Sequence, residues 1–249
     1  MKRIILWLML TSGGVSYAGN MSHLYQVGTF AAVLNGAVKG DVDYRFLKQK
    51  GNFGLGTFNG VTGEMVAYQG QFYQIGEKGV TLSVADETKT PYAQVIQFNP
   101  ALSFSLINID TFKQLADNLL PIFKNQNRAY AVHIHGDINY LKLRGRTPRK
   151  PGEPVPQETP YEAKNIQGDM IGFYFPEHLL SLTAPGLHLH FLSEDKQHSG
   201  HVMDVKFSTA TVELQSVTNL NLHIPDTIEY QSPKVPVPTL DTYCQSQSC

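Results

Sequence analysis

The sequence predicts an α+β fold of two strand-rich, mixed α/β sub-domains, with the functional site on a β-hairpin of the second. Short runs of β-branched and aromatic residues recur between glycine-containing turns, which is typical of strands. One longer segment, residues 111–123, has the apolar spacing of an amphipathic helix. A proline-rich stretch at 148–160 has neither the alternation of a strand nor the apolar spacing of a helix. We therefore expect sub-domains at 19–150 and 151–249, the second ending in an irregular tail.

The first 18 residues have the three-part pattern of a secretory signal peptide. Lys2 and Arg3 precede a short apolar run, and Ser16 and Ala18 supply the small side chains before a cleavage site. The alternative is an N-terminal core helix. No apolar stretch reaches the roughly 18 residues of a membrane span, so we expect export to the periplasm or the medium without a membrane anchor. Cleavage at this site would change the formal charge from −1 to −3.

Charge and cysteine content exclude several classes of protein. The 20 Lys and Arg residues nearly balance the 21 Asp and Glu residues, which argues against a nucleic-acid partner. The two cysteines, Cys244 and Cys249, could pair in an oxidising compartment, but they would close only a short loop of the tail. Neither lies near a histidine, so thiol catalysis and cysteine metal ligation are excluded from the body of the protein.

Local patterns predict the elements of the first sub-domain in order. A short helix is expected at 29–35, ended by Gly36. Strands are expected within 53–75, separated by Asn-Gly, Thr-Gly and Gln-Gly turns. The helix at 111–123 follows, with Asp110 as a candidate N-cap.

A hairpin across Gly136 and Asp137 is expected next, with strands at 129–135 and 138–144. Beyond the proline-rich connector, we expect a short helical piece near 177–182 and strands near 169–175, 187–192, 201–207, 211–215 and 219–224.

Three histidines are expected to converge on one face of a hairpin. His188 and His190 share a face because strand side chains alternate with a period of two. If the following turn lets His190 pair with His201, their Cβ atoms lie about 5 Å apart, and His188 lies diagonal to them. Three neutral imidazoles with an open fourth position form a usual catalytic zinc site, although this spacing alone does not exclude copper, iron, nickel or manganese. The alternative is a polar face of an exposed strand.

The remaining polar candidates are weaker. His133 and His135 have the same spacing, but no third histidine follows their turn, so we interpret them as a solvated strand face. Glu64 follows a tight turn beside apolar residues, where an acid can face a cavity. Arg144 ends a strand, where a guanidinium can bind a carboxylate in bidentate fashion. For Glu64 and Arg144, an ordinary surface charge is the alternative.

Two long blocks, at 51–66 and 186–204, carry a resemblance to a known family. The first reads Gly-Asn-Phe-Gly-Leu-Gly-Thr-Phe-Asn-Gly-Val-Thr-Gly-Glu-Met-Val, and the second begins Gly-Leu-His-Leu-His-Phe-Leu-Ser-Glu-Asp. With these blocks in this order, the chain resembles the acetolactate decarboxylases over most of its length. The resemblance implies a homodimeric enzyme that converts a small anionic substrate, 2-acetolactate, to (R)-acetoin and carbon dioxide, as in acetoin and butanediol formation.

The resemblance also implies site residues and a cofactor. It assigns one zinc ion (Zn2+) to His188, His190 and His201. The family's active-site Glu and Arg fall on Glu64 and Arg144. In that reaction, zinc would stabilise the charge that develops as carbon dioxide leaves, the arginine would orient the carboxylate, and the glutamate would transfer a proton.

Two positions in this assignment stay open. Arg146 replaces Arg144 if the register slips by two residues. The family carries a second active-site Glu near its C-terminus, but residues 233–249 contain no Glu. Glu229 or Asp241 would therefore have to substitute, or the site is altered.

Two other functions remain as alternatives. The spacing of His188, His190 and Glu194 matches the first motif of cupins, but Leu182 stands where that motif has Gly, and no second cupin motif follows. The other alternative is a non-catalytic secreted module that binds sugar or metal, in which Glu64 and Arg144 have no role.

Overall fold

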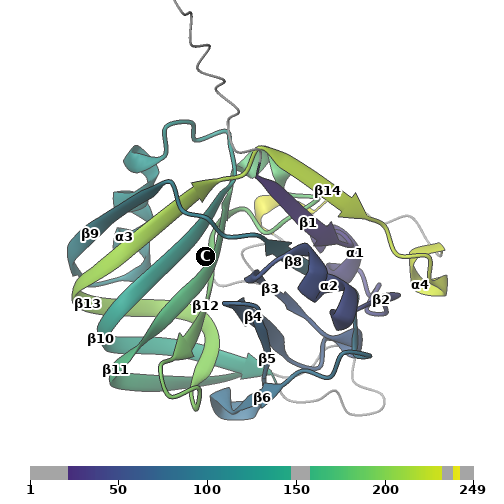
Figure 1. Ribbon diagram of the computed structural model, residues 1–249, viewed down its shortest axis with the longest axis horizontal. Helices are drawn as coiled ribbons and strands as arrows, with labels where there is room; N and C mark the ends of the chain where they lie inside the picture. Colours follow the sequence, from purple (N-terminus) through teal and green to yellow (C-terminus); the bar gives the residue numbers. More distant parts are fainter. Residues whose placement is uncertain (1–21, 147–157, 232–237, 242–249) are drawn as a thin grey trace, which may run out of the picture.

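The computed structural model describes residues 22–146, 158–231 and 238–241, and two β-sheets dominate it (Figure 1). A two-stranded pair accompanies them. The strand-rich α+β class is therefore confirmed. No helix among the described residues has the length and apolar content to span a bilayer. The predicted signal peptide and both cysteines lie outside the described residues.

The first sheet has seven strands in the order β14-β1-β8-β3-β4-β5-β6. β1 and β14 pair in parallel, so the chain returns to its first sheet near its end, and the other pairings are antiparallel. The strands are β1 (His23–Val27), β3 (Phe53–Thr57), β4 (Glu64–Tyr68), β5 (Gln71–Ile75), β6 (Thr81–Ser83), β8 (Ala93–Ile96) and β14 (Asn219–His223). The strands predicted within 53–75 are confirmed.

Short elements surround this sheet. The predicted helix near 29–35 is present, and the Thr29 hydroxyl caps it by accepting a hydrogen bond from the Ala32 N–H at 3.2 Å. The elements are α1 (Phe30–Leu34), α2 (Tyr44–Lys50), α4 (Ile228–Gln231), the paired strands β2 (Val42–Asp43) and β7 (Lys89–Thr90), and the 3₁₀ turns η1 (Asn59–Val61) and η2 (Glu77–Gly79).

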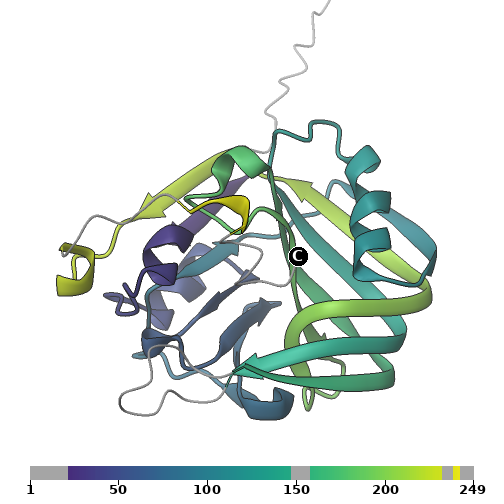
Figure 2. The same ribbon diagram turned by 180° about the vertical axis from the view of Figure 1, so that it is seen from behind.

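The second sheet has five antiparallel strands, and four of them close into a ring of pairings. β10 pairs with both β11 and β13, and β12 pairs with β11 and β13. Figure 2 shows how strongly the long strands, coloured teal to green, bend along their length. The strands are β9 (Leu102–Ile109), β10 (Tyr130–Arg146), β11 (Glu158–Phe175), β12 (Gly186–Ser193) and β13 (Ser199–Ser216).

The predicted hairpin across Gly136 and Asp137 is wrong, because β10 runs through both residues without a turn. Gly136 pairs with Gly168 on one side and with Ala210 on the other. A Cβ on Gly136 would lie 3.1 Å from the Thr209 carbonyl oxygen. The glycine therefore permits close strand packing and does not mark a turn.

Two further strand boundaries differ from the prediction. β11 begins at Glu158 and includes Pro160, which we expected in the connector. β13 is one strand where two were expected, because β9 and β10 flank it and continue its ladder. The boundary predicted after residue 150 falls between β10 and β11, which pair in one sheet.

The predicted long helix is shorter, and its cap is one residue later. α3 (Phe112–Leu119) continues into the 3₁₀ turn η3 (Leu120–Ile122), and η4 (Glu177–Leu179) follows β11. The Thr111 hydroxyl, not Asp110, caps α3 by accepting from the Gln114 N–H at 3.1 Å. Asp110 forms an ion pair with Lys206 instead.

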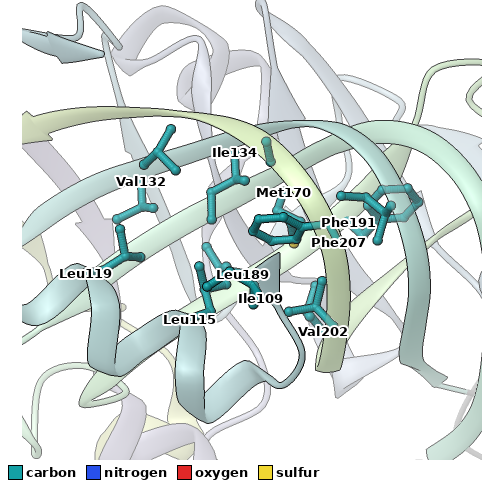
Figure 3. Packing of buried hydrophobic residues seen from close by; sticks show 14 of the residues in the cluster. Ile109, Leu115, Leu119, Val132, Ile134, Met170, Leu189, Phe191, Val202 and Phe207 are labelled. Atoms are coloured by element: carbon teal, nitrogen blue, oxygen red, sulfur yellow. The ribbon is translucent and has the colours of Figure 1, made fainter. Parts of the chain in front are cut away.

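One apolar cluster packs α3 against the second sheet, and another joins the two sheets. Leu115 and Leu119 of α3 point toward the concave strands of the second sheet, where Phe191 is also buried (Figure 3). A second cluster lies between the sheets and includes Phe53 from β3 and Phe173 from β11. This shared core fixes the first sheet against the second, and it is this contact that positions the site described below.

Truncating Phe191 tests the first cluster. Its side chain is fully buried, so Phe191→Ala is expected to lower the free energy of unfolding by about 3–5 kcal/mol through lost burial and a residual cavity. Leu82 on β6 is half exposed, and Leu82→Ala is the matched control, expected to change stability by about 0.5 kcal/mol or less. Urea unfolding of both variants measures the difference. Equal stability of the two variants would contradict this packing.

Candidate active site

Three adjacent strands of the second sheet place His190, His201 and Arg144 in one row. His190 lies opposite His201 in the β12–β13 ladder, which confirms the predicted pairing. His201 in turn lies opposite Arg144 in the β13–β10 ladder. A Cβ on Gly172 of β11 would lie 1.9 Å from the His188 carbonyl oxygen, so the glycine lets β12 approach closely enough to build this row.

The three histidines form a compact cluster of imidazoles. Their ring centroids are 5.1 Å apart for His188 and His190, 4.8 Å for His188 and His201, and 5.5 Å for His190 and His201. One ring nitrogen from each lies within 4.8 Å of the other two. His188 Nε2 and His201 Nδ1 are 3.2 Å apart. This group could therefore hold a metal ion.

The first sheet fixes the tautomer of His190. Its Nδ1 lies 2.8 Å from the backbone carbonyl oxygen of Met65 on β4. Because a carbonyl oxygen only accepts hydrogen bonds, Nδ1 carries the proton. In the neutral imidazole, the Nε2 lone pair then faces the cluster, which is the arrangement found for histidine metal ligands.

Glu64 reaches the cluster from the first sheet. It begins β4, is only 5% exposed, and lies opposite Thr57 in the β3–β4 ladder. Its Oε2 lies 3.2 Å from His190 Nε2 and 3.7 Å from His201 Nδ1. The preceding turn is held by the Thr57 hydroxyl, which donates to the Gly63 carbonyl oxygen at 2.6 Å. A buried carboxylate thus faces the point where the imidazole nitrogens converge.

Arg144 is almost completely buried, with 1% of its surface exposed. Its Nε lies 3.8 Å from Glu64 Oε1, and its Nη1 donates to Glu158 Oε1 at 2.7 Å. The strand ladder places Arg144 opposite His201 in this row. Glu158 was not predicted as a site residue, because it lies in the stretch that we interpreted as a connector.

These side chains line one cavity of about 130 Å³. Glu64, Arg144 and the three histidines form its polar wall. The opposite wall is mainly apolar and comes from α1, β3 and their neighbours. It consists of Phe30, Val33, Leu34, Val38, Leu55, Gly56, Thr57, Val61 and Tyr92. The cavity therefore suits a small molecule with an anionic end and short alkyl groups.

The other candidate acids lie elsewhere. Glu229 on α4 forms an ion pair with Lys39 at 3.3 Å, and Asp241 is exposed. Glu194 is exposed in the turn after β12. None of the three is among the residues that line the cavity.

His133 and His135 form part of a separate polar network. The interpretation of both as solvated is wrong for His133, which is 5% exposed and faces the layer between the sheets. Its Nε2 lies 2.8 Å from Asp169 Oδ1, and its Nδ1 lies 2.9 Å from Glu213 Oε2. His135 Nδ1 also contacts Asp169 Oδ1, at 3.0 Å. Asp169 and Glu213 lie far along the chain from His133, so local spacing does not reveal these contacts.

The carboxylates determine the charge of this network. Burial by itself lowers the pKa of His133, but its hydrogen bonds to Asp169 and Glu213 outweigh burial and raise that pKa above its usual value. Burial tends to raise the pKa of Asp169, but its bonds to His133 and the charges of His133 and His135 hold it below its usual value. Burial, together with the Asp169 charge, raises the pKa of nearby Tyr68 to about 12. His133 therefore lies between two acidic side chains that favour its protonated form.

Comparison with known proteins identifies many relatives. The family model described as alpha-acetolactate decarboxylase matches residues 24–236. The alpha-acetolactate decarboxylase of Brevibacillus brevis is 35% identical over 214 residues, which cover 83% of this chain and 74% of that protein. The alpha-acetolactate decarboxylase of Methanosarcina mazei is 35% identical over 208 residues, covering 81% of this chain and 72% of that protein.

A solved structure shares the fold over nearly the whole chain. The crystal structure of alpha-acetolactate decarboxylase from Bacillus subtilis strain 168 superposes with a TM-score of 0.85 at 25% sequence identity. The match covers 91% of this chain and 99% of that one.

The His133 network predicts a pH dependence of stability. The pKa of His133 is raised in the folded state, so its contribution is complete below about pH 6.5 and is lost as the pH rises through the folded value. The pKa of Asp169 is lowered, so its contribution is present above about pH 4 and is lost on further acidification. We expect His133→Gln to weaken the fall in melting temperature between neutral and alkaline pH, measured at a fixed metal content.

His178 on η4 is exposed and provides the matched control, His178→Gln. This control is expected to keep the wild-type pH profile. An unchanged profile in His133→Gln would show that the network does not couple stability to pH.

Proposed function

The chain belongs to the alpha-acetolactate decarboxylase family and is a carboxy-lyase that decarboxylates acetolactate; on this premise we propose that it uses zinc and forms (R)-acetoin. One observation carries the proposal. Three imidazoles, a buried carboxylate and a buried guanidinium line the same small cavity. We assign His188, His190 and His201 as metal ligands, and Glu64 and Arg144 as catalytic residues.

The donor set fits zinc. Neutral imidazole nitrogens are suitable zinc ligands, and the Met65 carbonyl leaves the Nε2 lone pair of His190 directed at the cluster. Three protein ligands leave a further position for a substrate or water. When bound, zinc supplies a Lewis acid that stabilises negative charge on the substrate oxygens.

Arg144 binds and orients the substrate carboxylate. Its guanidinium presents planar N–H donors that match a carboxylate, and its burial strengthens the attraction because water screens it less. The apolar wall from α1 and β3 faces the cavity and accepts the two methyl groups of acetolactate. This polarity pattern holds the carboxylate at one end of the cavity and the carbon that is protonated away from bulk water.

Glu64 transfers the proton: its carboxylate first takes up a proton and then donates it to carbon. Loss of carbon dioxide beside a ketone leaves an enediolate, which must gain a proton on carbon to become acetoin. Glu64 is 5% exposed and lies beside His190, His201 and Arg144, so its proton reaches the cavity from one fixed side. Delivery to one face of the enediolate supports the formation of a single enantiomer.

The alternatives are less well supported. In the cupin interpretation Glu194 binds the metal, but Glu194 is exposed and does not line the cavity. In a non-catalytic binding module, Glu64 and Arg144 have no role, yet both lie in the same cavity as the histidines.

Metal removal tests the cofactor. We expect the purified protein to form acetoin from 2-acetolactate, to lose this activity in a strong chelator, and to regain it with zinc.

His201→Ala removes one ligand and should lower the zinc content at least about tenfold, measured by elemental analysis. The exposed His198 lies in the neighbouring turn, and His198→Ala is the matched control that should retain zinc. Full zinc occupancy in His201→Ala would exclude this ligand set.

Glu64→Gln tests the proton transfer. The amide has nearly the same shape but holds no transferable carboxyl proton, so kcat is expected to fall by about 10²–10⁴-fold while zinc content stays unchanged. Acetoin formation and elemental analysis on the same sample measure both effects. Wild-type turnover in this variant would rule out Glu64 as the proton donor.

A further inference from the structure

We propose that Glu158 is a positioning residue that holds the Arg144 guanidinium in the orientation that binds the substrate carboxylate. This inference rests on the proposed role of Arg144 and adds a residue that acts through it. Glu158 is not among the residues that line the cavity, so it acts on the arginine and not on the substrate.

The contact between the two residues is short and charge-assisted. Arg144 Nη1 donates to Glu158 Oε1 at 2.7 Å, within the range of strong N–H to carboxylate bonds. The arginine side chain is 1% exposed and that of Glu158 is 38% exposed. The carboxylate therefore lies at the edge of the site, while the group that it holds is buried.

Strand register explains how Glu158 reaches Arg144. Glu158 is the first residue of β11 and lies opposite Arg146, whereas Arg144 lies opposite Pro160. The contact is therefore a diagonal one between neighbouring strands, within the reach of two long side chains. The continuous pairing of β10 with β11 keeps both backbones fixed.

Carboxylates contact two different nitrogens of the guanidinium. Glu64 Oε1 lies 3.8 Å from Arg144 Nε, and Glu158 Oε1 lies 2.7 Å from Nη1. Because a guanidinium is rigid and planar, partners on two different nitrogens fix the direction of its remaining donors. The same two negative charges also offset the cost of burying the arginine.

The reaction makes this orientation matter. In decarboxylation, the breaking carbon–carbon bond must overlap the π orbital of the neighbouring carbonyl. The carboxylate must therefore be held roughly perpendicular to the plane of that carbonyl. A free arginine side chain has about 2 kcal/mol of rotamer entropy to lose. A misplacement of about 1 Å at a reacting group can cost about 100-fold in rate. Loss of Glu158 should therefore reduce activity without removing a catalytic group.

The test compares two substitutions at Glu158 in the zinc-loaded enzyme. Glu158→Ala removes the acceptor and is expected to lower kcat/KM for 2-acetolactate by about 10–100-fold. Glu158→Gln keeps a carbonyl oxygen that can accept from Arg144 but loses the charge, so its loss is expected to be clearly smaller than that of Glu158→Ala. Zinc content and melting temperature are measured on each sample to confirm that the compared proteins are folded and loaded.

Glu162 provides a matched control on the same strand. It is exposed, and it accepts a hydrogen bond from the Tyr140 hydroxyl across the same pair of strands at 3.1 Å. Glu162→Ala is expected to keep wild-type kcat/KM. A loss in Glu162→Ala as large as that in Glu158→Ala would overturn the proposal, because it would show a general effect of changing the paired strands β10 and β11.

A double-substitution cycle with Arg144→Lys tests whether Glu158 acts through the arginine. If it does, Glu158→Ala has little further effect in the Arg144→Lys background, so the two losses are not additive. Additive losses, or wild-type kcat/KM in Glu158→Ala, would overturn the positioning role while leaving the proposed function intact. Full activity of Arg144→Lys would instead overturn the role of Arg144 and this inference with it. If Glu158→Ala does not fold, Glu158→Asp replaces it, with a smaller loss expected from its shorter reach.

Discussion

The buried carboxylate of Glu64 is the contact on which the rest of the site depends. It comes from the first sheet, yet it lies beside His190, His201 and Arg144 of the second. A charge excluded from water costs several kcal/mol unless opposite charges and donors surround it. Arg144 supplies an opposite charge 3.8 Å from Glu64, and Glu64 and Glu158 together supply opposite charges to Arg144. The same contact therefore joins the two sheets and assembles the chemistry.

The second sheet supplies its part through strand register. His190, His201 and Arg144 are neighbours in two consecutive ladders, and the ring of pairings among β10, β11, β12 and β13 leaves little freedom for one strand to slip. A slip of one residue would turn every side chain of a strand to the opposite face. The long, continuous strands therefore fix the positions of these site residues as well as stabilising the sheet.

Polar groups between the sheets are divided into two separate networks. The Glu64 and Arg144 network opens onto the cavity, whereas the His133 network is closed on itself by Asp169 and Glu213. The first lines the cavity, and the second pairs His133 with two acidic side chains. This division explains why two His-x-His pairs of identical spacing have different environments. One pair faces a neighbouring histidine and a cavity, and the other faces carboxylates.

Sequence by itself determined the features that depend on local spacing. The strand class, the helix after Thr29 and the pairing of His190 with His201 all follow from side-chain period and a short turn. The resemblance to a known family also placed Glu64 and Arg144 in the site. Only the tertiary structure decided that Gly136 lies inside a strand, that His133 is buried, and that Glu158 contacts Arg144. These features depend on which strands flank a segment and on the packing of one sheet against the other, and neither is encoded in the spacing of nearby residues.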